Sequence, residues 1–128
     1  MITAISGSRN GKTITALQQT GTWIPGNEPY AVDNLIFPGP GPQLTKNGFG
    51  FAIADGTYSN PFYADFLPTP AYLEFYSVPD SGSSTEVPVT FTATPTPEPT
   101  TFALMLVALA FCCYIARYKR HRMGLEKE

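Results

Sequence analysis

Reactive side chains are scarce in this chain of 128 residues. It has one histidine, His121, and its two cysteines, Cys112 and Cys113, are adjacent. The first 110 residues therefore lack both the histidine of a nucleophile–histidine pair and the nitrogen and sulfur ligands of a zinc site. Two neighbouring cysteines also provide no disulfide framework. We expect the chain to hold neither a metal nor any other cofactor.

Charge is also scarce, and it is unevenly distributed. Charged residues make up 14% of the chain, against about 25% in a typical soluble protein. Residues 1–116 carry three cations and eight carboxylates, which gives −5, whereas residues 117–128 carry five cations and two carboxylates, which gives +3. A negative body excludes a nucleic-acid partner held through phosphate charge. The basic end needs a separate explanation.

Helical periodicity is missing before residue 100, and short alternating segments separated by turn residues take its place. Asn10-Gly11 joins segments 2–8 and 12–17, and this dipeptide is a strong hairpin signal. Asp55-Gly56 joins segments 49–54 and 57–63 in the same way. We therefore expect two hairpins.

Other strand candidates differ in strength. Residues 71–78 alternate well. Residues 33–37 and 87–93 are weaker candidates, because the prolines of PGPGP (38–42) and Pro88 interrupt a ladder. Five to seven short strands in roughly 90 residues predict a mainly β body, either a small sandwich or an open twisted antiparallel sheet.

Aromatic residues are plentiful, and 13 of the 17 precede residue 100. Large aromatic side chains allow a small domain to build a core from few residues, so we interpret most of them as core. An alternative for Trp23, Tyr30 and Tyr63 is a platform on which sugar rings stack.

Carboxylate pairs are the remaining catalytic option. Asp55 with Asp65, or Asp33 with Glu74, would in principle flank a glycosidic bond. No spacing favours either pair, and the turn at Gly56 explains Asp55 better. We therefore expect no enzymatic activity.

Composition divides the chain into a β-rich body (1–84), a linker (85–100), an apolar segment (101–118) and a basic tail (117–128). Residues 85–101 contain seven threonines and four prolines. Such residues cannot bury a core, so we expect poor order over residues 80–100.

The apolar segment has the properties of a membrane span. No charge occurs from Pro99 to Ala116, and 18 residues of helix extend about 27 Å, close to the roughly 30 Å of a bilayer core. The span ends at a basic cluster, which the positive-inside rule places in the cytoplasm with the body outside. The cluster consists of Arg117, Lys119, Arg120 and Arg122. A buried core helix, the alternative, would not need these charges.

The order of these parts resembles a known sorting signal. Pro97, Glu98 and Pro99, followed by an apolar segment and a basic cluster, resemble the PEP-CTERM tail of Gram-negative bacteria. The resemblance implies a precursor held in the inner membrane until a membrane-embedded protease, exosortase, recognises the tail and cleaves it near the PEP motif. The body is similar to a pattern of short PEP-CTERM proteins, carried here by ISGSRNGKTITAL (5–17), DNLIFPG (33–39) and NGFGFAI (47–53).

This resemblance implies a cell-surface or exopolysaccharide-associated protein whose partners are the bilayer, an exosortase-like protease and, as a further candidate, extracellular polysaccharide. The processed form would lie at the cell surface or be secreted. Two alternatives stay open, namely an unprocessed single-pass membrane protein with an outer binding body, and a small carbohydrate- or ice-binding module. No signal peptide precedes the body, so we expect a truncated or mis-started gene product.

Overall fold

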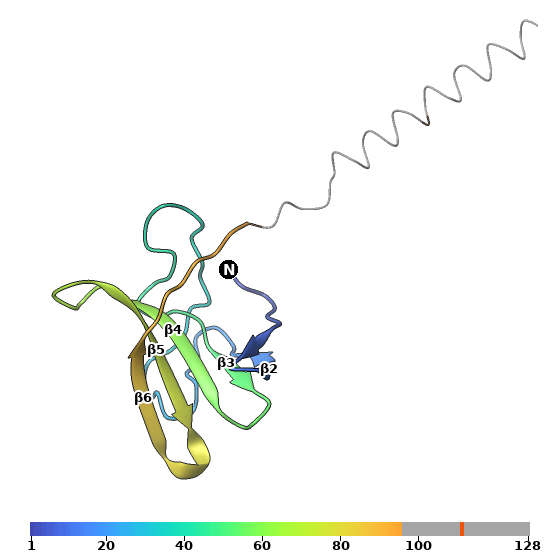
Figure 1. The fold of residues 1–128 in the computed structure, drawn as a ribbon, viewed down its shortest axis with the longest axis vertical. Helices are drawn as coiled ribbons and strands as arrows, with labels where there is room; N and C mark the ends of the chain where they lie inside the picture. The colour runs from blue at the N-terminus through green and yellow to red at the C-terminus, as the bar shows by residue number, and fades with distance from the viewer. Residues whose placement is uncertain (96–110, 112–128) are drawn as a thin grey trace, which may run out of the picture. The chain divides into compact units, whose positions relative to one another are not determined.

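The computed structural model describes residues 1–95 and residue 111. In this part of the chain, six strands form one sheet in the order β1-β2-β3-β4-β5-β6, and every neighbouring pair is antiparallel (Figure 1). The strands are β1 (Ser8–Arg9), β2 (Lys12–Leu17), β3 (Phe51–Ile53), β4 (Tyr58–Ala64), β5 (Ala71–Val78) and β6 (Ser83–Pro88), with a 3-10 turn η1 (Pro79–Ser81) before β6. The prediction of a mainly β body is confirmed.

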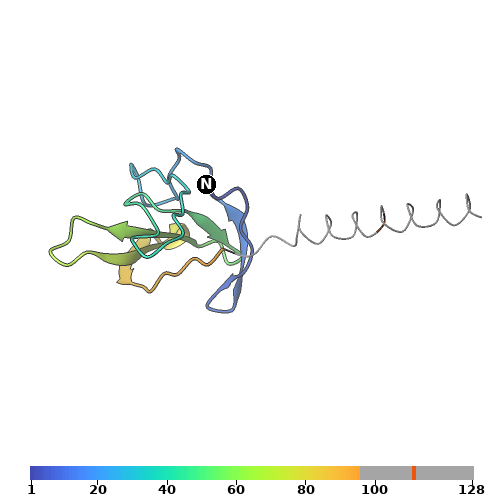
Figure 2. The same ribbon diagram turned by 90° about the horizontal axis from the view of Figure 1, so that it is seen from above.

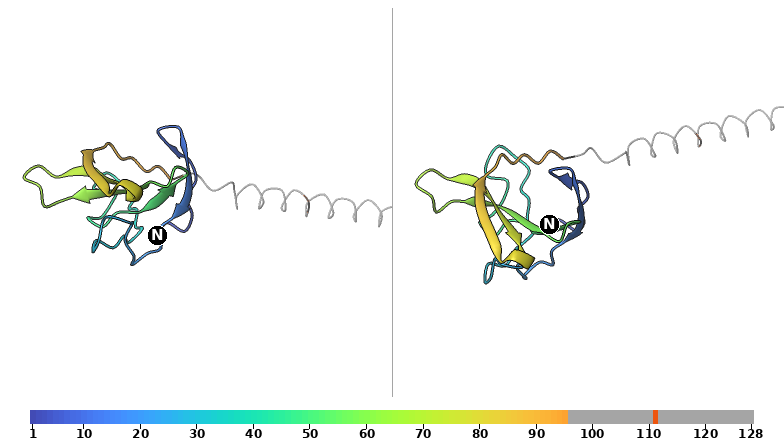
Figure 3. Two further views of the ribbon diagram at one scale, coloured as in Figure 1. Left: turned by 90° about the horizontal axis from the view of Figure 1, so that it is seen from below. Right: turned by 60° about the horizontal axis from the view of Figure 1, so that its bottom comes forward.

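The sheet is open and curled, with β1 and β6 at its two edges. Viewed from above, irregular chain between β2 and β3 lies over one side of it (Figure 2). The curl brings the β1–β2 hairpin opposite the β5–β6 hairpin (Figure 3). Of the two predicted architectures, the open antiparallel sheet is therefore the one that forms.

Both predicted hairpins are present, and the turn residues explain them. Asn10 and Gly11 have φ of 50° and 79°, as a two-residue hairpin loop with matching twist requires. In the second hairpin Gly56 has φ of 81°, and its N–H donates to the Ile53 carbonyl at 3.0 Å. The Asp55 carboxylate accepts from the N–H and hydroxyl of Thr57, which closes the turn.

The first predicted strand is much shorter than expected. Residues 2–7 form no strand: the Gly7 carbonyl still accepts from the Ile14 N–H of β2 at 3.0 Å, but the Ile2 N–H donates to the Asn34 carbonyl at 2.7 Å. Ile2 and Ile5 nevertheless pack against the core. These two residues are three positions apart and only partly buried, so the alternation expected of a strand predicts neither the backbone pairing nor the inward side chains of this segment.

Residues 18–50 are irregular but carry much of the core. Ile24, Val32 and Leu44 are almost fully buried. The strand expected at 33–37 is wrong: it reduces to one bridge between Ile36 and Leu44, which closes a loop over the Gly- and Pro-rich residues 38–42. Proline lacks an N–H, so this loop cannot extend into a ladder.

The main core cluster joins this irregular segment to the sheet. Its buried members are Leu44, Phe49, Phe51 and Ile53. The Phe49 ring lies 5.8 Å from that of Phe51, between centroids, and 5.9 Å from that of Phe91. The prediction that most aromatic residues are core is confirmed only in part: Phe49, Phe51 and Phe62 are buried and others pack against the cluster, but four are exposed. The exposed ones are Trp23, Tyr30, Phe37 and Phe66.

The chain beyond β5 is more ordered than expected. Residues 83–88 form β6, paired with β5 from Val78↔Ser83 to Leu73↔Pro88, so poor order is wrong for this stretch. Every residue of β6 is exposed, so its side chains give no pattern of burial. The backbone hydrogen bonds to β5 stabilise the strand instead. The strand expected at 87–93 lies instead at 83–88.

Residues 89–94, which we call the strap, follow β6 and pack back onto the body. Phe91 packs against the core cluster. The side chain of Gln43 accepts from the Ala93 N–H at 2.7 Å and donates to the Ala93 carbonyl at 3.1 Å. The first compact unit accordingly runs from Met1 to Thr94, ten residues further than the boundary expected at residue 84, and Pro95–Glu128 form the second unit.

Candidate functional site

The residues that the sequence assigns to sorting and membrane retention lie outside the described residues. They are Pro97, Glu98, Pro99, Arg117, Lys119, Arg120 and Arg122, and the predicted membrane span at 101–118 lies outside as well, apart from residue 111. Among residues 1–95 and 111, no helix has the length and apolarity to cross a bilayer.

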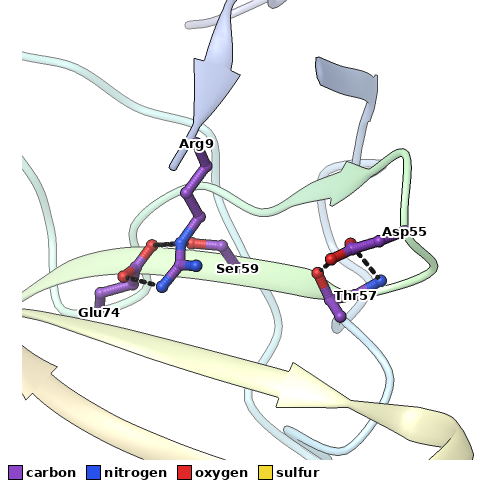
Figure 4. Close-up of polar contacts among 5 residues, drawn as sticks. All are labelled: Arg9, Asp55, Thr57, Ser59 and Glu74. Atoms are coloured by element: carbon purple, nitrogen blue, oxygen red, sulfur yellow. Dashed lines mark hydrogen bonds and ion pairs between the residues drawn. The ribbon is translucent and has the colours of Figure 1, made fainter. Parts of the chain in front are cut away.

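Three of the four carboxylates considered for glycoside hydrolysis, Asp33, Asp55 and Glu74, accept hydrogen bonds from other residues. Glu74 is buried on β5 and accepts both guanidinium hydrogen bonds of Arg9 at 2.7 Å, together with one from the Ser59 hydroxyl (Figure 4). Arg9 also lies 4.0 Å above the ring centroid of Tyr76. Asp33 instead accepts from the Thr45 hydroxyl at 2.6 Å and from the Leu35 N–H at 3.1 Å.

Asp55 closes its hairpin turn and pairs with Lys12. The Lys12 ammonium lies 2.5 Å from one oxygen of the Asp55 carboxylate. Thr57 donates to the other oxygen, as Figure 4 shows. These hydrogen bonds from Lys12 and Thr57 lower the pKa of Asp55 to about 2. Asp65, the partner proposed for it, is an exposed residue directly after β4.

The two ion pairs keep their carboxylates ionised. Burial would raise the pKa of Glu74, but the hydrogen bonds from Arg9 and Ser59 and the Arg9 charge together lower it. The hydrogen bond to Glu74 likewise raises the pKa of Arg9. A general acid needs a raised pKa, so neither Asp55 nor Glu74 is suited to protonate a leaving group. Both ion pairs instead connect β1 and β2 to the rest of the sheet.

A groove lies on the body within the described part of the chain. Its volume is about 470 Å³, and its lining comes from the irregular segment, β4, the β4–β5 loop and β6. The lining residues are Asn27, Tyr30, Lys46, Asn47, Asn60, Phe62, Phe66 and Glu86. Sites for small molecules span roughly 300–1,000 Å³, so a small ligand or a short part of a polymer would fit.

Strand register explains why two of these residues share one face of the sheet. Asn60 of β4 pairs with Phe75 of β5, and Phe75 pairs with Glu86 of β6. Directly paired residues project to the same face, so these three form one row across the sheet. Phe62, two residues after Asn60 on β4, projects to that face as well.

An amide pair forms the polar part of the groove. Asn60 is buried, and its NH₂ group donates to the carbonyls of Asn47 at 3.1 Å and Phe49 at 3.0 Å. Carbonyl oxygens only accept, so these bonds fix the orientation of the Asn60 amide and aim its oxygen at Asn27. Asn27 therefore donates its own NH₂ to that oxygen, at 3.1 Å.

The aromatic residues that the sequence suggested as a sugar platform are not brought together. Only Tyr30 lines the groove, where it is 69% exposed. The Tyr63 ring packs against Tyr72, with centroids 5.1 Å apart, and Trp23 is half exposed elsewhere. Phe66, which is 68% exposed, is the second aromatic residue of the groove and was not predicted.

The remaining groove residues had no signal in the sequence that would single them out. Asn27 and Asn60 are 33 positions apart, and neither belongs to a recognisable motif. The segment FLPTP (66–70) was a usable hint, because it exposes one aromatic residue in a Pro-rich loop between two strands. Within residues 1–95 and 111, no group of three His, Cys, Asp or Glu side chains could hold a metal ion.

Comparison with known proteins returned no relative. No protein-family model, no curated protein and no solved structure matches the chain.

Proposed function

We propose that this protein is an exported, non-enzymatic cell-surface or exopolysaccharide-associated protein, sorted through a PEP-CTERM-like tail. The observation that carries the proposal is the order of three features near the C-terminus: Pro97-Glu98-Pro99, a charge-free stretch to Ala116, and the basic cluster that starts at Arg117. Each feature alone is common, whereas the three in this order are typical of that sorting signal.

In this proposal the tail spans the inner membrane as a helix over 101–118. The basic cluster keeps residues 117–128 in the cytoplasm and the body outside. An exosortase-like protease then cleaves near the motif. Proline-rich chain favours an extended backbone that a protease cleft can accept, whereas a helix hides its peptide groups in its own hydrogen bonds.

The boundary of the folded unit supports this division of the chain. The compact unit ends at Thr94, just before Pro95 and the motif. The strap contributes Phe91 and the Ala93 hydrogen bonds to the body, and all of these residues precede the motif. Cleavage at the motif would therefore release the body with its packing complete.

The test grafts residues 95–128 onto an exported reporter in a host that has exosortase. The reporter should be shortened by loss of the tail, and the Glu98→Ala and Pro99→Ala variants should accumulate uncleaved in the membrane fraction. Thr96→Ala is the matched control, because it changes the same stretch without touching the motif. Equal processing of all variants, or no cleavage of the parent graft, would contradict the proposal and leave a membrane anchor.

A further inference from the structure

We propose that the groove binds a short stretch of a neutral glycan. The inference deepens the proposed function and rests on it only for the place where the protein would meet its ligand. Its basis is the combination of exposed aromatic rings with an oriented, partly unused amide in one groove.

The aromatic part of the groove suits the apolar face of a sugar ring. Tyr30 and Phe66 come from different segments and are 69% and 68% exposed, although each is large and apolar enough to be buried. Phe62, the third aromatic residue of the lining, is buried. A pyranose ring presents C–H groups on its faces, and these pack on aromatic rings, which supply contact area at little entropic cost.

The polar part of the groove suits hydroxyl groups. Because Asn60 fixes Asn27 as a donor, the Asn27 carbonyl oxygen points away from the amide pair, and no hydrogen bond within the described residues uses it. Asn27 also keeps one N–H for a ligand. An amide that offers an acceptor beside a donor matches a sugar hydroxyl, which donates and accepts at once.

Charge favours a neutral glycan over an acidic one. The lining includes one cation, Lys46, and one carboxylate, Glu86, and neither takes part in a salt bridge within the described chain. Residues 1–94 carry three cations and seven carboxylates, which gives −4. The field of such a body repels a polyanion.

A proline-rich peptide is the competing ligand for a groove with aromatic walls. Such a peptide presents many carbonyl acceptors and few N–H donors. The carbonyls of such a peptide would satisfy the free N–H of Asn27, but its backbone would leave the Asn27 oxygen, an acceptor, without a donor. A sugar hydroxyl would satisfy it, so the observations favour a glycan.

The test is isothermal titration calorimetry on the full chain in zwitterionic micelles, which carry no sugar headgroup. The probes are linear neutral hexasaccharides of glucose, mannose and galactose, a hexagalacturonate and a decaproline peptide. At least one neutral probe should bind, and its affinity should be insensitive to salt because no charge is neutralised. Phe66→Ala and Tyr30→Ala should each weaken binding about tenfold or more, as loss of an aromatic anchor does.

Phe37→Ala is the matched control, because Phe37 is an exposed aromatic residue (52%) outside the groove lining, and it should bind like the parent. Thermal melting of each variant separates loss of binding from loss of fold, and two independent groove variants allow for one that fails to fold. Absence of binding to every neutral probe, preference for the acidic or proline probe, or equal weakening in Phe37→Ala would overturn the inference. The graft experiment reports on the tail alone, so failure of the groove and failure of sorting are distinguishable.

Discussion

At the scale of single residues, glycine is decisive where the irregular segment meets the sheet. Gly48 has φ of +60°, and a Cβ there would lie 1.9 Å from the Pro61 carbonyl oxygen. Gly11 also has a positive φ, +79°, but a Cβ there would meet nothing within 4 Å. A side chain at either position would strain the backbone, but only one at Gly48 would also overlap a neighbour, so comparing substitutions at the two positions separates the two effects.

We expect Gly48→Ala to destabilise the body by about 3 kcal/mol or more. The new Cβ would force the backbone to move away from the Pro61 carbonyl, and alanine would also be strained at a positive φ. Gly11→Ala, the control, should cost only about 1–2 kcal/mol, the penalty of a left-handed conformation. Urea unfolding followed by Trp23 fluorescence measures both. Equal losses in the two variants would show that the close approach at Gly48 is not tight.

The two ion pairs, Arg9–Glu74 and Lys12–Asp55, set a second residue-scale expectation, the dependence of stability on pH. The pKa values of Asp55 and Glu74 are lower in the folded chain than their ordinary values. Their contribution to stability is therefore complete above about pH 4–5. It is lost as the pH falls through the folded pKa values, which for Asp55 is about 2.

We expect Glu74→Gln to be less stable than the parent at pH 7, since Arg9 loses its partner, and to show a flatter decline between pH 5 and pH 2. Asp65→Asn, which changes an exposed carboxylate, should follow the parent curve. Urea midpoints at a series of pH values provide the measurement. A Glu74→Gln curve parallel to that of the parent would contradict the role given to this ion pair.

At the scale of elements, the sequence predicts what is local and misses what is distant. Asn10-Gly11 and Asp55-Gly56 place both hairpins correctly, because a turn depends on its own residues. The Arg9–Glu74 pair joins residues 65 positions apart, and no sequence pattern links them. Part of the candidate site was equally out of reach, since the groove forms only when residues 27–47 pack against β4 and β6.

Residues 83–94 show a second limit of prediction. The sequence of β6 is rich in Ser and Thr and all of it is exposed, so hydrophobic pattern gives no reason to expect a strand. Its backbone pairs with β5 regardless of side-chain character, and Gln43 then binds the strap through main-chain groups. Composition therefore suggested a linker where the chain is part of the fold.

The strap gives the element-scale prediction. A chain ending after Thr94 should retain the stability of the body, whereas one ending after Pro88 should lose about 3 kcal/mol, from the Phe91 ring and the two Gln43 hydrogen bonds. Chemical denaturation of the two chains is the measurement. Phe91→Ala in the longer chain should account for most of the difference, and equal stability of both chains would contradict the assignment of the strap to the body.

At the scale of the whole molecule, a folded body ends at Thr94, and we assign a separate role to the tail that follows it. The body carries the ion pairs, the core and the groove, and we propose that the tail serves only in sorting. This separation predicts that processing and glycan binding are independent. Phe66→Ala should leave cleavage unchanged, and Glu98→Ala should leave the groove unchanged.

The most direct measurement of the central claim is the intact mass of the protein recovered from a host that has exosortase, expressed with an export signal placed before Met1. The account predicts a product that ends near Pro99, keeps the whole of residues 1–94, and has lost the apolar segment and the basic cluster. Glu98→Ala should leave the full-length mass in the membrane fraction. Recovery of the parent chain at full length, still carrying residues 100–128, would contradict the account.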